Sequence, residues 1–245
     1  MKTLILIPSR MSATRLPGKP LLKINGLSII SHVMKRAQKA NIGEVYVATG
    51  DEEILGDVKK NGGQGILTSN DHKTGTDRIY EGLKKLDNPN VELVMNLQGD
   101  EPLMNVEDLR HLHKQMIKTK SELGTLASII DNKNLYSNPN VVKVVTKKSL
   151  QNDQFPEAST FSRNLINDNK NTYHHLGVYC YRYETLKKFI SFKQSQNELN
   201  YKLEQLRALD NNIRINVALA KDSPISVDTE EDFVAIKKIM EYKSK

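Results

Sequence analysis

Three fixed cations lie within ten residues of one another near the N-terminus, at Arg10, Arg15 and Lys19. They follow a short apolar run that ends at Pro8, and the loop between them contains small residues whose backbone N–H groups can face an anion. Backbone donors together with arginine and lysine side chains are the groups that bind a triphosphate. The loop lacks the glycine spacing of a P-loop and of a dinucleotide-binding turn. We therefore predict a phosphate-binding loop of another type, with a solvated basic surface loop as the alternative.

Two aspartates in distant segments could supply a metal site. Asp100 follows an apolar run and precedes Pro102, and Asp228 precedes Thr229 shortly before the C-terminal segment. Magnesium prefers hard oxygen ligands, usually one or two protein carboxylates together with water and substrate phosphate oxygens. If the two aspartates meet, a metal ion between them would neutralise charge on the reacting phosphate. The alternatives are that Asp100 is a turn residue and that Asp228 and Thr229 cap the last helix.

The elements that must position these residues alternate along the first half of the chain. We expect strands over residues 4–7, 45–49, 65–68 and 91–97, and helices over 28–39, 51–61, 76–85 and 105–120. Asp51 is placed to cap the second of these helices. The alternation predicts an α/β fold with a mostly parallel central sheet and helices on both faces. Because ligands sit at the carboxyl ends of such strands, the segments after Ile7 and Leu97 should share one crevice.

The second half is less regular. We expect strands over residues 124–130, 141–146, 176–182 and 213–220, and helices over 183–192, 199–209 and 230–242. Residues 149–172 are polar and predict a loop or lid. The sequence contains neither an internal repeat nor a clear linker, so we predict a single domain over 1–245 with an inserted strand and loop portion at about 132–190.

Composition limits the classes of protein to consider. The chain has 245 residues, 38% hydrophobic and 27% charged, which favours a globular protein. Its apolar runs are far shorter than the roughly 20 residues that span a bilayer. The single cysteine, Cys180, excludes an internal disulfide and fits a reducing compartment. The net charge of +7 comes from scattered lysines without interleaved aromatics, which disfavours nucleic-acid binding. We therefore expect a cytoplasmic protein with neither a membrane nor a nucleic-acid partner.

Several motifs together resemble one enzyme family. The three most specific are Gln98-Gly99-Asp100-Glu101-Pro102, His175-Leu176-Gly177-Val178-Tyr179 and Leu203-Glu204-Gln205-Leu206-Arg207. With the basic N-terminal loop, and with further matches over nearly the whole chain, they resemble the 3-deoxy-manno-octulosonate (Kdo) cytidylyltransferases, also called CMP-Kdo synthetases. The resemblance implies a Rossmann-like nucleotidyltransferase fold with a smaller strand-rich dimerisation portion, and a homodimer that serves lipopolysaccharide synthesis.

The resemblance also implies a reaction and a set of site residues. The anomeric hydroxyl of Kdo, an acidic eight-carbon sugar, would attack the α-phosphorus of CTP with Mg²⁺ as cofactor, and pyrophosphate would leave. The implied catalytic residues are Arg10, Lys19, Asp100 and Asp228, of which Asp100 and Asp228 would bind the metal. The implied nucleotide-binding residues are Pro8, Ser9, Arg10, Arg15, Lys19, Thr74, Gly75, Arg78 and Gln98. The implied sugar-binding residues are Gln98, Arg163, His175, Tyr179, Glu204 and Gln205. Without the resemblance, His175 and Tyr179 would be interpreted as packed residues.

Two departures from the family pattern lie near the expected sugar end. Asn164-Leu165-Ile166-Asn167-Asp168 follows Arg163, and Tyr201 stands where a second acidic residue often follows Glu198. The alternatives are therefore a cytidylyltransferase for a related acid sugar, either 8-amino-Kdo or a sialic-type acid, and a nucleotide-binding sensor module without turnover.

Overall fold

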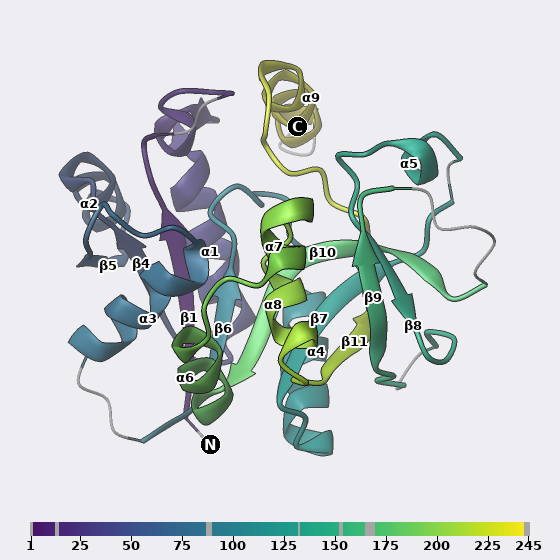
Figure 1. Ribbon diagram of the computed structural model, residues 1–245. Helices are drawn as coiled ribbons and strands as arrows, with labels where there is room; N and C mark the ends of the chain where they lie inside the picture. The colour runs from purple at the N-terminus through teal and green to yellow at the C-terminus, as the bar shows by residue number, and fades with distance from the viewer. Residues whose placement is uncertain are drawn as a thin grey trace. The chain divides into compact units, whose positions relative to one another are not determined.

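The structure is a computed structural model that describes residues 2–12, 15–86, 90–131, 133–151, 154–164 and 170–242. The chain forms two compact units (Figure 1). Unit 1 comprises Met1–Val106 together with Pro224–Lys245, and unit 2 comprises Glu107–Ser223. The C-terminal segment thus returns to the unit in which the chain begins. The expectation of a single domain over 1–245 stays a prediction.

Unit 1 is built on parallel strands. Strands β6 (Val91–Leu97), β1 (Lys2–Ser9), β4 (Glu44–Thr49) and β5 (Gln64–Leu67) lie side by side in that order, and every pair is parallel. Residues 3–9 of β1 are all buried, as expected for a central parallel strand covered on both faces. The four strands expected from the sequence in this half are confirmed.

Helices cover both faces of these strands. α1 (Ile29–Ala40) connects β1 to β4 and α2 (Glu52–Lys60) connects β4 to β5, so both crossovers run in the same direction along the sheet. α3 (Gly75–Lys85) connects β5 back across to β6. Because parallel crossovers are right-handed, the reversed direction places α3 on the opposite face from α1 and α2. The predicted α/β architecture is confirmed.

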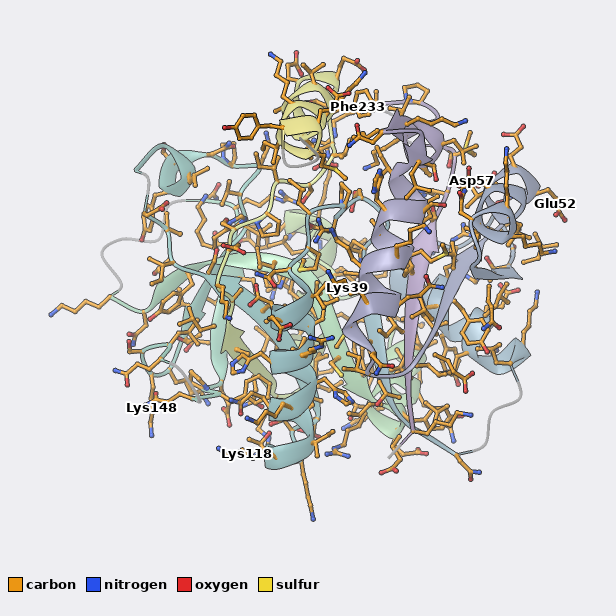
Figure 2. All side chains as sticks on the ribbon, turned by 180° about the vertical axis from the view of Figure 1, so that it is seen from behind. Lys39, Glu52, Asp57, Lys118, Lys148 and Phe233 are labelled. Carbon is orange, nitrogen blue, oxygen red and sulfur yellow. The ribbon has the colours of Figure 1, made fainter. Side chains whose placement is uncertain are left out.

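A small apolar cluster holds the C-terminal segment inside unit 1. It lies beside the short 3-10 helix η1 (Lys19–Leu21), the hairpin β2 (Lys23–Ile24) and β3 (Leu27–Ser28), and helix α9 (Glu230–Tyr242). Phe233 lies on α9 in Figure 2 and packs against this cluster. The buried members are Leu16, Ile24, Ile29, Val227 and Ile236. Burying these side chains ties the basic loop to the segment that carries Asp228.

Unit 2 contains the strand-rich portion. β10 (Thr172–Arg182) is antiparallel to β7 (Leu123–Ser128) and to β8 (Lys143–Thr146), and β9 (Ala158–Ser162) is antiparallel to β8. β11 (Ile215–Leu219) lies parallel to β7. The helices of the segment are α4 (Val106–Thr119), α5 (Lys133–Ser137), α6 (Tyr183–Ser191), α7 (Gln196–Tyr201) and α8 (Gln205–Asp210). The smaller strand-rich portion is thus confirmed, and its role in dimerisation stays a prediction.

Two expectations for unit 2 are wrong in detail. The segment 149–172, predicted as a loop, contains β9, and within it residues 152–153 and 165–169 lie outside the described residues. The helix expected over 199–209 is two helices, because Lys202 adopts a left-handed conformation with φ 53°. This break separates α7 from α8, which begins immediately after Glu204.

The remaining surface and compositional expectations fit the described chain. Lys118 and Lys148 extend outward from the ribbon in Figure 2, as expected of scattered solvated lysines. Cys180 is buried and free. Within the residues that the structure describes, none of the helices is long and apolar enough to cross a membrane.

Candidate active site

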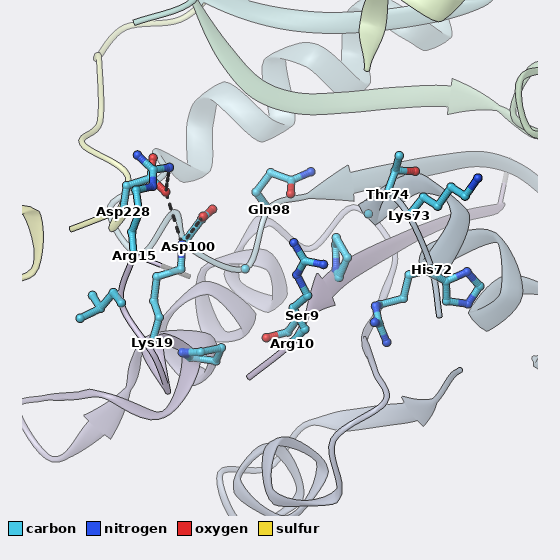
Figure 3. Close-up of a pocket in the computed structure, with 16 residues that line it drawn as sticks. Ser9, Arg10, Arg15, Lys19, His72, Lys73, Thr74, Gln98, Asp100 and Asp228 are labelled. Atoms are coloured by element: carbon cyan, nitrogen blue, oxygen red, sulfur yellow. Dashed lines mark hydrogen bonds and ion pairs between the residues drawn. The ribbon is translucent and has the colours of Figure 1, made fainter. Parts of the chain in front are cut away.

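A pocket of about 370 Å³ opens at the carboxyl ends of β1 and β6 in unit 1 (Figure 3). This is where the parallel sheet predicts a ligand crevice, and the volume is in the range of small-molecule sites. The lining residues come from the ends of β1 and β6, the basic loop, the segment before α3 and the segment before α9. They are Pro8, Ser9, Arg10, Arg15, Leu16, Lys19, Pro20, His72, Lys73, Thr74, Gly75, Arg78, Gln98, Gly99, Asp100 and Asp228.

The basic loop is held in shape by its own backbone contacts. The carboxylate of Asp51 accepts a hydrogen bond from the Met11 backbone N–H at 2.9 Å, and it makes no capping bond to α2. The capping role expected for Asp51 is therefore wrong, because the loop uses the carboxylate instead. Gly18 adopts φ 70°, a left-handed conformation that glycine takes without steric cost, and it starts η1. The turn brings Lys19 to the pocket with its side chain only 14% exposed.

The two predicted metal-binding aspartates lie together around one lysine. Lys19 Nζ is 2.7 Å from Asp100 Oδ2 and 3.5 Å from Asp228 Oδ1. The two carboxylate oxygens are therefore at most 6.2 Å apart, which is the sum of these distances. Arg15 adds a second contact to Asp228, with 3.1 Å between Nη2 and Oδ1. A single cation already bridges both carboxylates, so their oxygens converge as the sequence interpretation required.

Hydrogen bonds between two distant segments bring the aspartates together. The Val227 N–H donates to the Asp100 carbonyl oxygen at 2.9 Å, and Ser226 Oγ donates to Glu101 Oε1 at 2.9 Å. Burial, reinforced by the negative charge of Asp100, raises the pKa of Glu101 to about 8. Glu101 is therefore mainly protonated at pH 7, and it adds no full negative charge beside the two aspartates. The sequence analysis did not identify Glu101 as a site residue, although it lies within the quoted motif.

Asp228 is not the cap of the last helix. Thr229 Oγ1 accepts from the Asp232 N–H at 3.2 Å, and Asp232 Oδ2 accepts from the Thr229 N–H at 2.9 Å. This reciprocal pair caps α9 in the manner of a capping box. The carboxylate of Asp228 is thereby left to Arg15 and Lys19, which supports the metal-site alternative over the capping alternative.

The opposite side of the pocket is cationic. Figure 3 shows His72, Lys73 and Thr74 on one side of the pocket and Arg15, Lys19, Asp100 and Asp228 on the other. Thr74 Oγ1 caps α3 by accepting from the Asp77 N–H at 3.2 Å, so the positive end of the helix dipole faces the pocket. Arg78 on α3 is 3% exposed and donates to Thr68 Oγ1 at 2.7 Å.

Gln98 lies between these two sides in Figure 3. Its Nε2 donates to Asn96 Oδ1 at 3.2 Å, which orients the amide at the end of β6. The pocket thus collects all the predicted nucleotide-binding residues. His72 and Lys73 also line it and were not proposed from the sequence. The position of Lys73 directly before the cap of α3 was a readable signal for an anion-binding role.

The charge of the pocket favours a polyanion. Its lining contains five cationic side chains, Arg10, Arg15, Lys19, Lys73 and Arg78, and two acidic ones, Asp100 and Asp228. A cleft with an excess of one charge concentrates ligands of the opposite charge. Three of the five cations, Arg10, Lys73 and Arg78, make no ion pair with the acidic side chains that the structure describes. They remain able to bind phosphate oxygens.

The other predicted sugar-binding residues belong to unit 2. His175 and Tyr179 lie on β10, with ring centroids 5.5 Å apart, and both side chains are nearly buried. Burial lowers the pKa of His175 to about 3. Burial, with smaller effects of Tyr181 and Glu204, raises the pKa of Tyr179 well above its usual value.

The last three sugar-binding candidates lie at element ends of unit 2. Glu204 and Gln205 form the start of α8. Arg163 follows β9, and its Nη1 donates to the Pro139 carbonyl oxygen at 3.3 Å. The buried Lys143 side chain donates to the carbonyl oxygens of Asn138 at 2.7 Å and of Arg163 at 2.9 Å. Lys143 therefore fixes the backbone from which Arg163 projects.

Comparison with known proteins places this arrangement in a family. Residues 4–215 match the model of the family described as cytidylyltransferase. The 3-deoxy-manno-octulosonate cytidylyltransferase of Nitrobacter hamburgensis is 40% identical over 244 residues, covering 98% of this chain and 93% of that protein. The enzyme of the same name from Afipia carboxidovorans is 42% identical over 240 residues, covering 97% and 96%. A solved structure of CMP:2-keto-3-deoxy-manno-octonic acid synthetase complexed with CTP has a TM-score of 0.88 and 34% identity, covering 99% of this chain and 100% of that one.

The fold and the family match together define a nucleotidyltransferase of the cytidylyltransferase class, with a Rossmann-like architecture. The identities extend over nearly the full length of the chain and of its relatives. The chain belongs to the 3-deoxy-manno-octulosonate cytidylyltransferase family.

Proposed function

We propose that this protein couples CTP to Kdo, forming CMP-Kdo and releasing pyrophosphate, in a magnesium-dependent reaction that serves lipopolysaccharide synthesis. The observation that carries the proposal is the pocket in which Asp100 and Asp228 converge on one cation beside the cationic loop. Family membership supports the choice of CTP and Kdo, because relatives bearing that enzyme name share about 40% identity with this chain. We also propose a cytoplasmic homodimer that has no nucleic-acid or membrane partner.

The chain's own side chains have separable roles in this reaction. Arg10, Arg15 and Lys19 bind the triphosphate and neutralise its charge, and the capped start of α3 at Thr74 and Gly75 supplies backbone N–H donors. Gln98 and Arg78 complete the nucleotide-binding set. Phosphoryl transfer depends on positioning and charge neutralisation more than on covalent chemistry of the protein. We therefore expect no covalent enzyme intermediate.

Asp100 and Asp228 would hold Mg²⁺. The donor set fits, because the ion commonly takes one or two carboxylates and completes its coordination with water and phosphate oxygens. The part of the chain that the structure describes offers no group of three or more acidic, histidine or cysteine side chains that could hold a metal on its own. When bound, the ion supplies charge neutralisation at the reacting phosphate and activation of the attacking hydroxyl.

The sugar would be held by Arg163, His175, Tyr179, Glu204, Gln205 and Gln98. A guanidinium can bind the sugar carboxylate with two parallel hydrogen bonds, which suits Arg163. Amide, phenol, imidazole and carboxylate groups can donate to or accept from the hydroxyls. The two departures near Arg163 and Tyr201 leave 8-amino-Kdo and sialic-type acids as the substrates to compare with Kdo.

The test incubates the purified protein with CTP, Mg²⁺ and one sugar acid at a time, and weighs the product by mass spectrometry. We expect CMP-Kdo as the main product. A product with 8-amino-Kdo or a sialic-type acid alone would replace Kdo as the substrate. Binding of CTP without any product from the panel would favour the sensor module and contradict the proposed enzyme.

Asp228→Asn tests the metal site within the same assay. We expect turnover to fall at least about 100-fold, the scale on which one charge-stabilising group acts, while CTP binding changes little. The matched control is Glu231→Gln, which removes an exposed carboxylate from the neighbouring helix α9. Equal turnover in both variants would remove Asp228 from the mechanism.

A further inference from the structure

A threonine hydroxyl inside unit 2 sits at an irregularity of β10. The register of β10 against β7 shifts between Leu176 and Tyr179, so that Leu176 pairs with Leu126 while Tyr179 pairs with the adjacent Thr125. Two residues of β10 are thus left without a partner on β7, which is the arrangement of a β-bulge. Thr125 is fully buried at this bulge, and its Oγ1 lies 2.7 Å from the Val178 carbonyl oxygen and 3.3 Å from that of Leu176.

The same hydroxyl contacts the predicted sugar-binding histidine. Thr125 Oγ1 lies 3.0 Å from Nε2 of His175. A threonine hydroxyl carries one proton, and a carbonyl oxygen can only accept. The distance of 2.7 Å to Val178 is typical of an O–H···O bond, so the proton of Thr125 points to that carbonyl. Thr125 can then only accept from His175, which places the imidazole proton on Nε2.

The ring of His175 is also held in position by its neighbours. Phe161 contacts it edge to face with centroids 5.0 Å apart, and Tyr179 lies at 5.5 Å. Burial lowers the pKa of His175 to about 3, so the ring is neutral at pH 7. A neutral imidazole with its proton on Nε2 has a lone pair on Nδ1. Among the described residues, Nδ1 of His175 has no hydrogen-bond partner.

We infer that Thr125 is a positioning residue that fixes His175 as the Nε2–H tautomer, so that His175 offers Nδ1 as an acceptor to a hydroxyl group of the sugar. The inference rests on the proposed function for the identity of the ligand, and on the described contacts alone for the tautomer. It assigns His175 to a hydroxyl and not to the carboxylate, because a neutral acceptor cannot pair with an anion. Sugar recognition would thus depend on a residue of β7 that need not touch the sugar.

The tautomer is tested without any substrate. Nitrogen-15 NMR of the imidazole in the full-length protein at pH 7 should show a proton on Nε2 and none on Nδ1 of His175. Thr125→Val keeps the shape of the side chain but removes the acceptor, so this single-tautomer signature should be lost. Thr125→Ser keeps the hydroxyl and should restore it. A proton on Nδ1 in the unaltered protein would overturn the inference, whatever sugar the enzyme uses.

The role in sugar binding is tested by steady-state kinetics. We expect Thr125→Val to raise KM for Kdo about tenfold, the scale of one hydrogen bond, with KM for CTP unchanged and with rescue by Thr125→Ser. The matched control is Thr146→Val, because Thr146 is another buried strand threonine of unit 2 and donates to the Lys148 carbonyl oxygen at 2.6 Å. An equal rise in KM for Kdo in both valine variants would show a merely structural effect and refute the positioning role. If the protein activates no sugar acid, the proposed function fails while the NMR result still decides the tautomer.

Discussion

The ion pair between Glu198 and Arg207 is expected to dominate the stability of unit 2. Arg207 Nε donates to Glu198 Oε2 at 2.7 Å and Arg207 Nη2 donates to Glu198 Oε1 at 2.6 Å, so the pair is bidentate. The two side chains are only 2% and 4% exposed. The guanidinium also stacks over the Phe189 ring at 4.6 Å. The pair therefore joins α7, α8 and α6 at one buried point.

Arg207→Met keeps the apolar volume but leaves the Glu198 carboxylate buried without its counter-ion. Breaking a buried pair in this way costs about 3–5 kcal/mol. Glu198 retains bonds from Gln194 Nε2 at 3.0 Å and from the Ser195 N–H at 3.3 Å, which compensate only part of the loss. With a urea m-value near 3 kcal/mol/M, we expect the unfolding midpoint to fall by about 1 M or more. Far-UV circular dichroism across a urea series measures this shift.

The dependence on pH gives an independent sign for the same change. Burial alone would raise the pKa of Glu198, but its bonds from Arg207 and Gln194 lower the pKa overall. In the unaltered protein the pair therefore contributes stability above the unfolded pKa of about 4.3, and that stability is lost as pH falls below it. In Arg207→Met only burial and weaker donors remain, so the pKa should rise. The deficit of the variant should then shrink as pH falls.

The control is Arg214→Met in the same unit. Arg214 lies 3.2 Å from Glu122, but the two side chains are 67% and 38% exposed. Exposed pairs of this kind are worth less than about 1 kcal/mol. If Arg207→Met costs no more than Arg214→Met, the buried pair is not what joins these helices and the reasoning is wrong.

Two further predictions concern unit 1. Gly99→Ala should lower the free energy of unfolding by about 1–3 kcal/mol, because the added Cβ would lie 2.8 Å from the Pro8 carbonyl oxygen at the pocket; Gly56→Ala, where the Cβ of α2 meets open space, should instead stabilise by about 0.5–1 kcal/mol, and equal effects in urea unfolding would contradict the close approach. Burial alone would raise the pKa of Glu81, but Lys85, His72 and the Ser69 N–H together lower it to about 2. Because the folded pKa is lowered, Glu81 should stabilise the protein above about pH 4.5 and lose that contribution as pH falls towards 2; acid unfolding of Glu81→Gln should lack this component, and an unchanged acid profile would count against it.

The regular first half was predictable because its signals are local. A short buried strand such as β1 reads as a continuous apolar run, and α1 shows one apolar face in its spacing. Where polar residues form an exposed strand the same rules fail. β9 was missed because its middle residues, Ser159 and Thr160, are polar and exposed.

The break between α7 and α8 shows a second limit. Leu199, Leu203 and Leu206 have helical spacing, which predicted one continuous helix. The chain instead turns at Lys202, whose left-handed conformation costs energy that propensity alone does not foresee. The start of α7 was readable, since Ser195 and Glu198 form a capping box. The residues that define a helix start are adjacent in sequence, whereas the break at Lys202 is fixed by the packing around α8.

The convergence of Asp100 and Asp228 lies beyond any local signal. Spacing gives no reason for the two segments to meet, and each aspartate alone fits a turn or a cap. The contact depends on the Val227 N–H, on Ser226 and on a Glu101 side chain that burial keeps mainly protonated. A third full charge beside the two aspartates would repel both, so neutral Glu101 lets the segments close at the point where one cation has to be shared. The same carboxyl group that looks like a surplus acid in the sequence is thus what allows the two functional acids to lie together.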